Sequence, residues 1–217
     1  MPELRELYER LFRAFGPQGW WPARGPFEVA VGAVLTQNTN WANVKRAVRN
    51  LRRAGALSPQ AIHRMAEAEL ARLIRPSGYY NVKARRLKHL VEFLISECGG
   101  RLRSLRRQDA QELRRRLLRV KGIGPETADS ILLYALEKPV FVVDAYTLRV
   151  LKRHGLLSPQ AGYQEAQELF HKALEPDARL FNEFHALFVR VGKEFCRPRR
   201  PLCGGCPLLS LGPPRST

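Results

Sequence analysis

Residues 120–129 are the most informative segment of this sequence and read Val120-Lys121-Gly122-Ile123-Gly124-Pro125-Glu126-Thr127-Ala128-Asp129. Two glycines on either side of one apolar residue predict a tight turn between two helices, with Ile123 packed inward. Pro125 suits the first position of the second helix. Such a turn presents backbone N–H groups and a positive helix end to a phosphate, although an ordinary helix hairpin fits the same pattern.

Apolar residues recur at helical spacing on both sides of this stretch. A serine cap followed by proline at Ser58-Pro59 predicts a helix start, and Ser158-Pro159 repeats the signal. Only Val140–Val143 looks like a strand, and it is too short and isolated to found a sheet. The expected fold is therefore all-α, with helices over 4–15, 27–35, 40–51, 66–74, 80–97, 110–119, 125–136, 145–154, 161–174 and 180–193.

The charge of the chain indicates a polyanionic partner. The 37 Lys and Arg residues exceed the 20 Asp and Glu residues, which leaves a net charge of +17. A phosphate backbone favours such an excess, whereas a ribosomal-type protein, a membrane-surface binder or a composition without functional meaning remain alternatives. No apolar run is long enough to cross a bilayer, and the first twenty residues lack a signal-peptide core. We therefore expect a cytoplasmic, nucleoid-associated protein without a membrane partner.

A second candidate site follows the hairpin by about twenty residues, where Asp144 ends the apolar run 140–143. An acid just before a helix is most often an N-cap. That role is compatible with catalysis, because a capping carboxylate is ionised, rigidly held and keeps one oxygen for a reacting centre. A fixed anion stabilises the oxocarbenium-like transition state through which a glycosidic bond breaks.

Three of the four cysteines form a third candidate site near the C-terminus. Cys196, Cys203 and Cys206 have the spacing x6, x2, whereas Cys98 stands alone. Clustered thiolates in a loop of prolines and glycines suit a soft metal, although three buried thiols are the alternative. A closed site needs a fourth ligand, and the position six residues after Cys206 is Gly212. Cys98 completes the set only if the fold brings it near.

Together these features resemble the helix-hairpin-helix glycosylase superfamily that includes endonuclease III, from about Phe27 to Cys206. The resemblance implies a six-helix barrel lobe over 23–137, with the hairpin at about 113–133. It implies a second lobe from 1–22 and 138–217, with the cysteine loop 196–206 and the substrate cleft between the lobes. The expected partner is a duplex DNA with a damaged base, bound by a monomer. Besides the hairpin, Asp144 and the cysteine loop, two further segments carry this resemblance. They are Leu35-Thr36-Gln37-Asn38-Thr39 and Gly78-Tyr79-Tyr80-Asn81-Val82-Lys83-Ala84.

The resemblance also assigns roles to single residues. It implies that Asp144 is the catalytic aspartate, that Gln37 fills the space left by the extruded base and that Tyr79 is the wedge in the duplex. The hairpin contacts with DNA fall on Gly122, Ile123, Gly124 and Thr127. The cysteine loop of endonuclease III binds a [4Fe–4S] cluster, but Gly212 stands where the fourth cysteine belongs. An iron–sulfur cluster on Cys196, Cys203 and Cys206 therefore lacks a ligand, and base release itself requires no cofactor.

Glu126 differs from the residue that bifunctional members of the superfamily carry at this position, and this difference determines the reaction that we expect. Bifunctional members of the superfamily carry a lysine at this position, which attacks the sugar and forms a Schiff base. A carboxylate cannot form that imine, so we expect hydrolysis without strand cleavage, with water guided by Asp144. Glu126 also suits the first turn of a helix electrostatically, which is compatible with this loss.

The damaged base is indicated by a closer resemblance to the 3-methyladenine DNA glycosylase III branch, which shares Trp20-Trp21-Pro22, Arg75-Pro76-Ser77-Gly78 and the glutamate at 126. The resemblance implies a flipped base stacked among Trp20, Trp21 and Trp41, with Pro22 and Lys193 beside it. A positively charged alkylated purine suits indole faces. The alternatives are tryptophans that only support a loop, a glycosylase for a mismatched pyrimidine or oxidised base, and a non-catalytic damage sensor.

Overall fold

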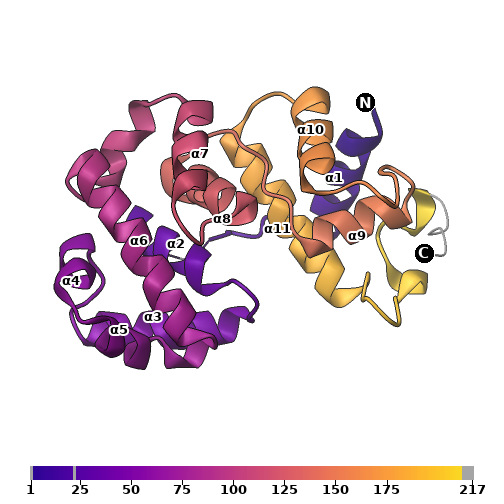
Figure 1. Cartoon of the computed structure of the whole chain (residues 1–217). Helices are drawn as coiled ribbons and strands as arrows, with labels where there is room; N and C mark the ends of the chain where they lie inside the picture. Colours follow the sequence, from indigo (N-terminus) through magenta and orange to yellow (C-terminus); the bar gives the residue numbers. More distant parts are fainter. Residues whose placement is uncertain (1, 22, 212–217) are drawn as a thin grey trace. The chain divides into compact units, whose positions relative to one another are not determined.

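The computed structural model describes residues 2–21 and 23–211, and within these residues it contains helices and no strand (Figure 1). This confirms the all-α prediction. The α-helices are α1 (Pro2–Phe15), α2 (Pro26–Leu35), α3 (Trp41–Arg53), α4 (Pro59–Arg64), α5 (Glu67–Leu73), α6 (Tyr80–Cys98), α7 (Ala110–Arg119), α8 (Pro125–Ser130), α9 (Ala145–Arg153), α10 (Tyr163–Ala173) and α11 (Ala178–Glu194). Shorter helical turns are η1 (Arg75–Ser77), η2 (Leu102–Arg107), η3 (Ile131–Ala135), η4 (Cys203–Gly205) and η5 (Leu209–Leu211).

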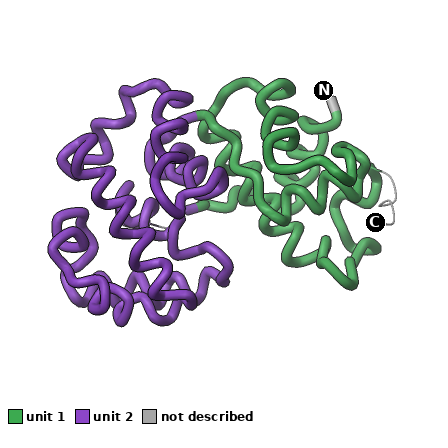
Figure 2. Tube along the Cα trace, viewed as in Figure 1, with its two compact units in different colours: residues 1–20, 139–217 green, residues 21–138 purple. Residues whose placement is uncertain are grey.

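The chain folds into two compact units (Figure 2). Unit 1 combines Met1–Trp20 with Pro139–Thr217, so the two ends of the chain contribute to one unit. It contains α1, α9, α10 and α11. Unit 2 is the continuous segment Trp21–Lys138, which contains α2 to α8 and η3.

Unit 2 is organised around the long helix α6, which packs against α2, α4 and α5. Its buried face carries apolar residues at helical spacing, including Leu87, Leu90, Val91 and Leu94. Helix α8 continues directly into η3, a turn of π-helix that also packs on α2. These contacts hold the turn before α8 on a rigid helical scaffold.

The core of unit 1 is a cluster of phenylalanines around the extended segment 140–143. The rings of Phe141 and Phe170 stack with centroids 3.5 Å apart. The backbone N–H and carbonyl of Phe141 form hydrogen bonds with side chains of α10 and not with a second strand. Its N–H donates to Nε2 of His171 at 2.9 Å, and its carbonyl accepts from Nε2 of Gln167 at 2.7 Å. A buried, hydrogen-bonded segment therefore leads directly into Asp144.

The two Ser-Pro signals in the sequence have different outcomes. Ser58 caps α4 as predicted, accepting from the backbone N–H of Ala61. The prediction of a helix start at Ser158-Pro159 is wrong. The Ser158 hydroxyl donates to Gln160 instead, and α10 begins at Tyr163 after the N-cap Gly162. The competing signal was the glutamate at 165, whose side chain accepts from the Gly162 N–H.

Lys83 on α6 is a cation inside unit 2, with only 1% of its surface exposed. Its Nζ donates to the carbonyl of Leu35 at 2.9 Å and to the carbonyl of Ser77 at 2.7 Å. Burial, and to a smaller extent the neighbouring Arg86 charge, lowers the pKa of Lys83 from 10.5 to about 8.

This pKa predicts how stability depends on pH. Between pH 8 and pH 10 the unfolded chain holds a proton on Lys83 that the folded chain releases, so raising the pH favours the folded state. Relative to K83M, the free energy of unfolding of the wild type should rise by about 2 kcal/mol over this range. Urea denaturation of both proteins at pH 8, 9 and 10 measures the difference. A difference that stays constant or falls would contradict the lowered pKa.

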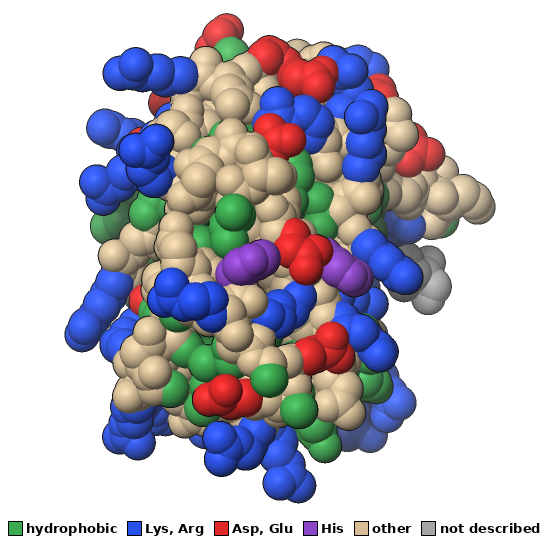
Figure 3. All heavy atoms as spheres, turned by 60° about the vertical axis from the view of Figure 1, so that its left-hand side comes forward, with side chains coloured by type: hydrophobic (Ala, Val, Ile, Leu, Met, Phe, Trp, Pro, Cys, Tyr) green, Lys and Arg blue, Asp and Glu red, His purple; other side chains and the backbone are tan. Residues whose placement is uncertain are grey.

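The surface of the molecule is basic. On the face drawn in Figure 3, Lys and Arg side chains are spread widely and outnumber the acidic side chains. Among the described residues, no helix combines the length and the apolar character that crossing a membrane requires. The charge therefore favours a polyanion as the partner of this surface.

Candidate active site

Asp144 caps the N-terminus of α9, as its place in the sequence predicts. Its Oδ1 accepts hydrogen bonds from the backbone N–H of Thr147 at 2.8 Å and from the Thr147 hydroxyl at 3.0 Å. Its Oδ2 lies 3.5 Å from Nε2 of His185 on α11. The side chain of Asp144 is 12% exposed, so it is held on several sides and remains in contact with solvent.

The environment of Asp144 keeps the carboxyl ionised. Burial is the largest single influence and by itself raises the pKa. The hydrogen bond and the charge of His185 and the two hydrogen bonds from Thr147 outweigh it, so that the pKa of Asp144 lies below its ordinary value. An immobile anion of this kind stabilises positive charge that develops on a sugar.

His185 is a residue of this site that the sequence pattern did not reveal. It is buried on α11, and only the packing of α11 against α9 brings it to Asp144. The available signal was a single histidine within the apolar run 184–189. That signal is weak, because a buried histidine more often satisfies a structural hydrogen bond.

Tyr146 and Lys193 extend the site within unit 1. The Tyr146 ring lies against Gly192 of α11, where an added Cβ would come within 2.5 Å of Cδ1 of the ring. Glycine is therefore required for this approach. The Nζ of Lys193 lies 5.9 Å from the ring centroids of both Tyr146 and Trp20. The predicted pocket residues Trp20 and Lys193 thus lie together, joined by a tyrosine that was not predicted.

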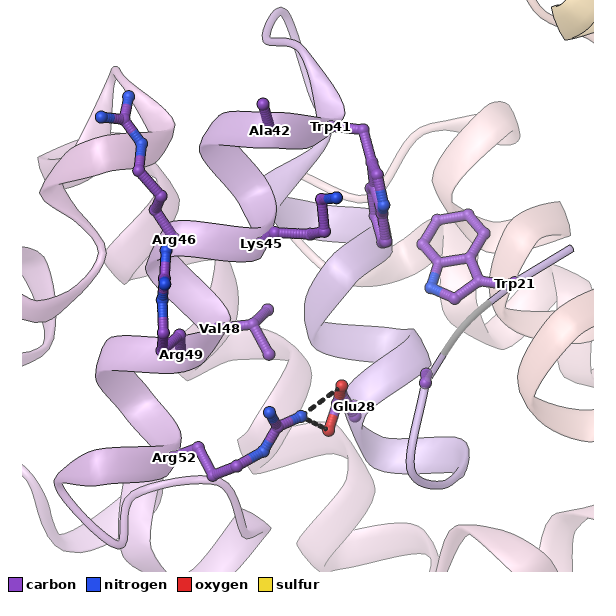
Figure 4. Close-up of a pocket in the computed structure, with 10 residues that line it drawn as sticks. Trp21, Glu28, Trp41, Ala42, Lys45, Arg46, Val48, Arg49 and Arg52 are labelled. Carbon is purple, nitrogen blue, oxygen red and sulfur yellow. Dashed lines mark hydrogen bonds and ion pairs between the residues drawn. The ribbon is translucent and has the colours of Figure 1, made fainter.

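Trp21 and Trp41 lie together in unit 2, on the wall of a hollow of about 670 Å³ (Figure 4). Their ring centroids are 4.9 Å apart with an edge-to-face angle of 77°, and Trp21 also lies 5.0 Å from the ring of Tyr134. Trp21 rests on α2 at Gly32, where a Cβ would meet the indole at 3.0 Å. The edge of one indole contacts the other ring, so the two indoles pack on each other. Pro22, predicted for the same pocket, lies outside the described residues.

The same hollow is lined by basic residues of α3, which contains no acid. Arg52 is neutralised by Glu28, as the dashed lines in Figure 4 mark, with an N–O distance of 2.7 Å. Lys45, Arg46 and Arg49 also line the hollow and form no ion pair with a described carboxylate. The hollow is therefore electropositive, which suits phosphate groups of DNA.

The turn before α8 has the geometry that its glycines predict. Gly122 adopts a φ of 91°, a left-handed conformation that favours glycine. Ile123 is 4% exposed, and its N–H donates to the carbonyl of Val120 at 3.0 Å. A Cβ added at Gly124 would meet no atom within 4 Å. The backbone before α8 is thus open for the approach of a phosphate.

Gln37 is folded onto this hairpin. Its Nε2 donates to the carbonyl of Gly122 at 3.2 Å and to the hydroxyl of the buried Thr127 at 2.9 Å. Its Oε1 accepts from Arg86. Gln37 must leave these partners before it can fill a gap in DNA. Tyr79, the predicted wedge, is by contrast 70% exposed.

A family model described as HhH-GPD superfamily base excision DNA repair protein matches residues 31–176. The chain belongs to the HhH-GPD superfamily. It is a DNA glycosylase of base excision repair, and the match covers the hairpin, Asp144, Gln37 and Tyr79 alike.

Relatives and solved structures agree with this HhH-GPD assignment. A protein of Methanocaldococcus jannaschii named as a DNA repair glycosylase is 45% identical over 94% of this chain and 92% of its own length. The structure of H. pylori 3-methyladenine DNA glycosylase (MagIII) bound to 1,N6-ethenoadenine is 31% identical, with a TM-score of 0.75 over 89% of this chain and 95% of that one. A trapped endonuclease III–DNA covalent intermediate is 25% identical, with a TM-score of 0.82 over 97% of this chain and 94% of that one. The predicted family and the endonuclease III-like fold are confirmed.

Glu126 of this HhH-GPD protein is exposed in the first turn of α8. A carboxylate at a helix N-terminus is electrostatically favourable there, as expected from the sequence. The neighbouring acid Asp129 has a structural role, because it is buried and forms a two-fold ion pair with Arg114 at 2.7 and 3.0 Å.

The cysteine loop of this HhH-GPD protein lies in unit 1. Cys196, Cys203 and Cys206 line one small apolar cavity together with Arg153 and His154. The guanidinium of Arg153 donates to Sγ of Cys196 at 3.4 Å and to the carbonyls of Arg197 and Pro198. The loop is therefore held against α9 by protein contacts.

The residues present do not fit a closed four-thiolate cluster. In the described parts of the chain, no three His, Cys, Asp or Glu side chains lie close enough together to hold a metal ion. Cys98 belongs to unit 2, where its Sγ donates to the carbonyl of Leu94 at 3.0 Å. Gly212 has no thiol, and it lies outside the described residues.

Proposed function

We propose that this glycosylase is monofunctional and hydrolyses the N-glycosidic bond of an everted alkylated purine, such as 3-methyladenine. The observation that carries the proposal is Asp144, an ionised carboxylate fixed at a helix N-terminus by Thr147 and facing His185. The carboxylate keeps its charge at neutral pH because its hydrogen bonds outweigh its burial.

In the proposed reaction Asp144 stabilises the sugar as the bond to the base breaks. The anion lies against the developing oxocarbenium ion and orients a water molecule that adds to the anomeric carbon. The water proton passes to solvent or to the carboxylate. A purine alkylated at N3, such as 3-methyladenine, is already cationic in DNA and leaves as a neutral base, so its release requires no general acid. A carboxylate with a lowered pKa suits this role better than that of a proton donor.

Glu126 supports hydrolysis without strand cleavage. A covalent intermediate with the sugar requires an amine that forms a Schiff base, and a carboxylate at this position cannot form one. The first turn of α8 therefore supplies a negative charge beside the hairpin and no nucleophile for β-elimination.

The aromatic groups support an alkylated purine as the substrate. Trp21, Trp41 and Tyr134 form one cluster in unit 2, and Trp20 lies with Tyr146 and Lys193 in unit 1. Indole faces attract a cationic base by stacking and by cation–π interaction. The H. pylori 3-methyladenine glycosylase similar to this chain was solved with ethenoadenine bound. An adenine derivative is therefore the first substrate to test.

A glycosylase assay across a panel of lesion duplexes tests this proposal. The panel holds 3-methyladenine, ethenoadenine, 8-oxoguanine, and uracil and thymine opposite guanine. Free base and strand breaks are scored separately. We expect release of the alkylated purine, no breaks before alkaline treatment and no protein–DNA adduct with borohydride. E126K is the matched variant, since it restores an amine at this position.

Other outcomes of this assay would each contradict a stated part of the proposal. Breaks without alkali or a borohydride adduct of the wild type would show lyase chemistry from another lysine. Preferred release of a mismatched pyrimidine or of 8-oxoguanine would change the substrate. Binding without release of any base would favour the damage sensor.

A further inference from the structure

Three basic residues on one face of α6 contact the three turns predicted to meet DNA, which are the turn of Gln37, the turn of Tyr79 and the hairpin turn at 121–124. Lys83, Arg86 and His89 are spaced by three, which places them on the same side of the helix. Arg86 donates to the side chain of Gln37 and lies so close to Gly122 that a Cβ there would be 2.4 Å from its Cγ. The Nδ1 of His89 lies 3.1 Å from the carbonyl of Lys121.

Lys83 joins the other two turns to each other. Its Nζ binds the carbonyls of Leu35 and Ser77, and these carbonyls lie two residues before Gln37 and two residues before Tyr79. One buried ammonium therefore spans the turns that carry the predicted gap-filling side chain and the predicted wedge. Charge-assisted hydrogen bonds of this kind are stronger than neutral ones.

Both turns have backbone conformations that need support from outside. Asn38 and Tyr79 have φ values of 52° and 46°, in the left-handed region that side chains other than glycine rarely adopt. Such conformations persist only where the surrounding structure fixes them. The carbonyl contacts of Lys83 lie within three residues of each strained position, so they supply part of this support.

We propose that Lys83 is a positioning residue for base eversion, which holds the turn of Gln37 and the turn of Tyr79 at a fixed separation so that both side chains enter the duplex together. The inference rests on the proposed function, because it assumes that these turns insert into DNA. It adds a role for a buried side chain that contacts neither the DNA nor the reacting atoms.

Lys88 provides a matched control on the same helix. Its Nζ also donates to two backbone carbonyls, those of Ile62 at 3.0 Å and His63 at 2.7 Å. These carbonyls belong to α4, which carries none of the residues predicted to meet DNA. K88M therefore removes the same number of lysine–carbonyl hydrogen bonds as K83M, from a side chain that is less buried. A purely structural role predicts similar defects in both variants.

The test is the fluorescence of 2-aminopurine placed opposite a tetrahydrofuran abasic analogue in a duplex. In the wild type we expect unstacking of the probe as the two turns insert. K83M should reduce the amplitude or the rate of this signal by about tenfold or more, because small misplacements have large effects on assembled sites. K88M should stay within about twofold of the wild type, and all three proteins should bind undamaged duplex within about threefold of each other.

Several results would overturn the inference. These are a K83M signal equal to that of the wild type, an equal loss in K88M, and a wild type that does not unstack the probe. If K83M does not fold, as judged by its circular dichroism, K83Q replaces it and should give an intermediate signal, since its amide still donates a hydrogen bond. The abasic duplex requires no base release. A lesion panel without base release would therefore contradict the proposed function and would not affect the fluorescence measurement.

Discussion

Asp144→Asn should lower the rate of base release at least about 10³-fold while leaving the affinity for a lesion duplex within about threefold of the wild type. The substitution keeps the size of the side chain and an oxygen that can accept from the Thr147 N–H, so α9 remains capped. It removes the negative charge that stabilises the oxocarbenium-like transition state. Single-turnover rates with excess enzyme separate this loss from any change in binding.

Asp177→Asn is the matched control for this prediction. Asp177 also belongs to unit 1 and caps α11, where it accepts from the N–H groups of Arg179 and Leu180. Its replacement changes the same functional group at a second helix N-terminus and should leave base release close to the wild-type rate. Equal losses in the two variants would show that capping, and not the charge at position 144, limits the reaction. Full activity of D144N would end the assignment of Asp144 as the catalytic residue.

Gly124→Val should weaken binding to damaged and undamaged duplexes alike, by roughly 10- to 100-fold, which is the effect of losing one or two hydrogen bonds to a charged phosphate. Gly124 has φ −94° and ψ 179°, which a β-branched residue adopts without strain. A Cβ at this position meets no protein atom within 4 Å, so the melting temperature should not change. The new side chain instead fills the space in which the hairpin would receive a phosphate. Fluorescence anisotropy at several salt concentrations measures the loss.

Gly162→Val is the control for the hairpin variant. Gly162 is likewise an N-cap glycine with extended backbone, and a Cβ there would meet only Glu165 at an ordinary 3.5 Å. This variant should bind DNA as the wild type does. If G124V also binds DNA normally, the turn 122–124 does not bind a phosphate. The affinity of the protein for DNA must then come from other basic surfaces, such as the hollow lined by α3.

Helix positions were largely predictable, because caps and apolar periodicity act over a few residues. Ser58 and Asp144 cap the helices that follow them, and Ile123 is buried within its turn. The failure at Ser158-Pro159 has the same local origin, since Gly162 and Glu165 offered a competing start for α10.

The partners of the site residues were not predictable from spacing. His185 reaches Asp144 only because α11 packs on α9, and Lys83 is buried only because α6 packs on the ends of α2 and η1. The family resemblance implied one pocket for Trp20, Trp21 and Trp41, and the spacing did not reveal that Trp20 lies near Lys193 in unit 1 and Trp21 near Trp41 in unit 2. Neighbours in the chain can belong to different units when the chain passes from one to the other between them.

The helical class, the glycine turn before α8 and the acid at the N-terminus of α9 could all be predicted from the sequence, because each depends on interactions within about one helical turn. The packing of distant helices was needed to learn that a histidine faces this acid, that Gln37 is folded onto the hairpin and that one buried lysine joins two turns. Electrostatic environment and burial depend on residues that are distant in the chain, and only folding brings those residues within a few ångströms of each other.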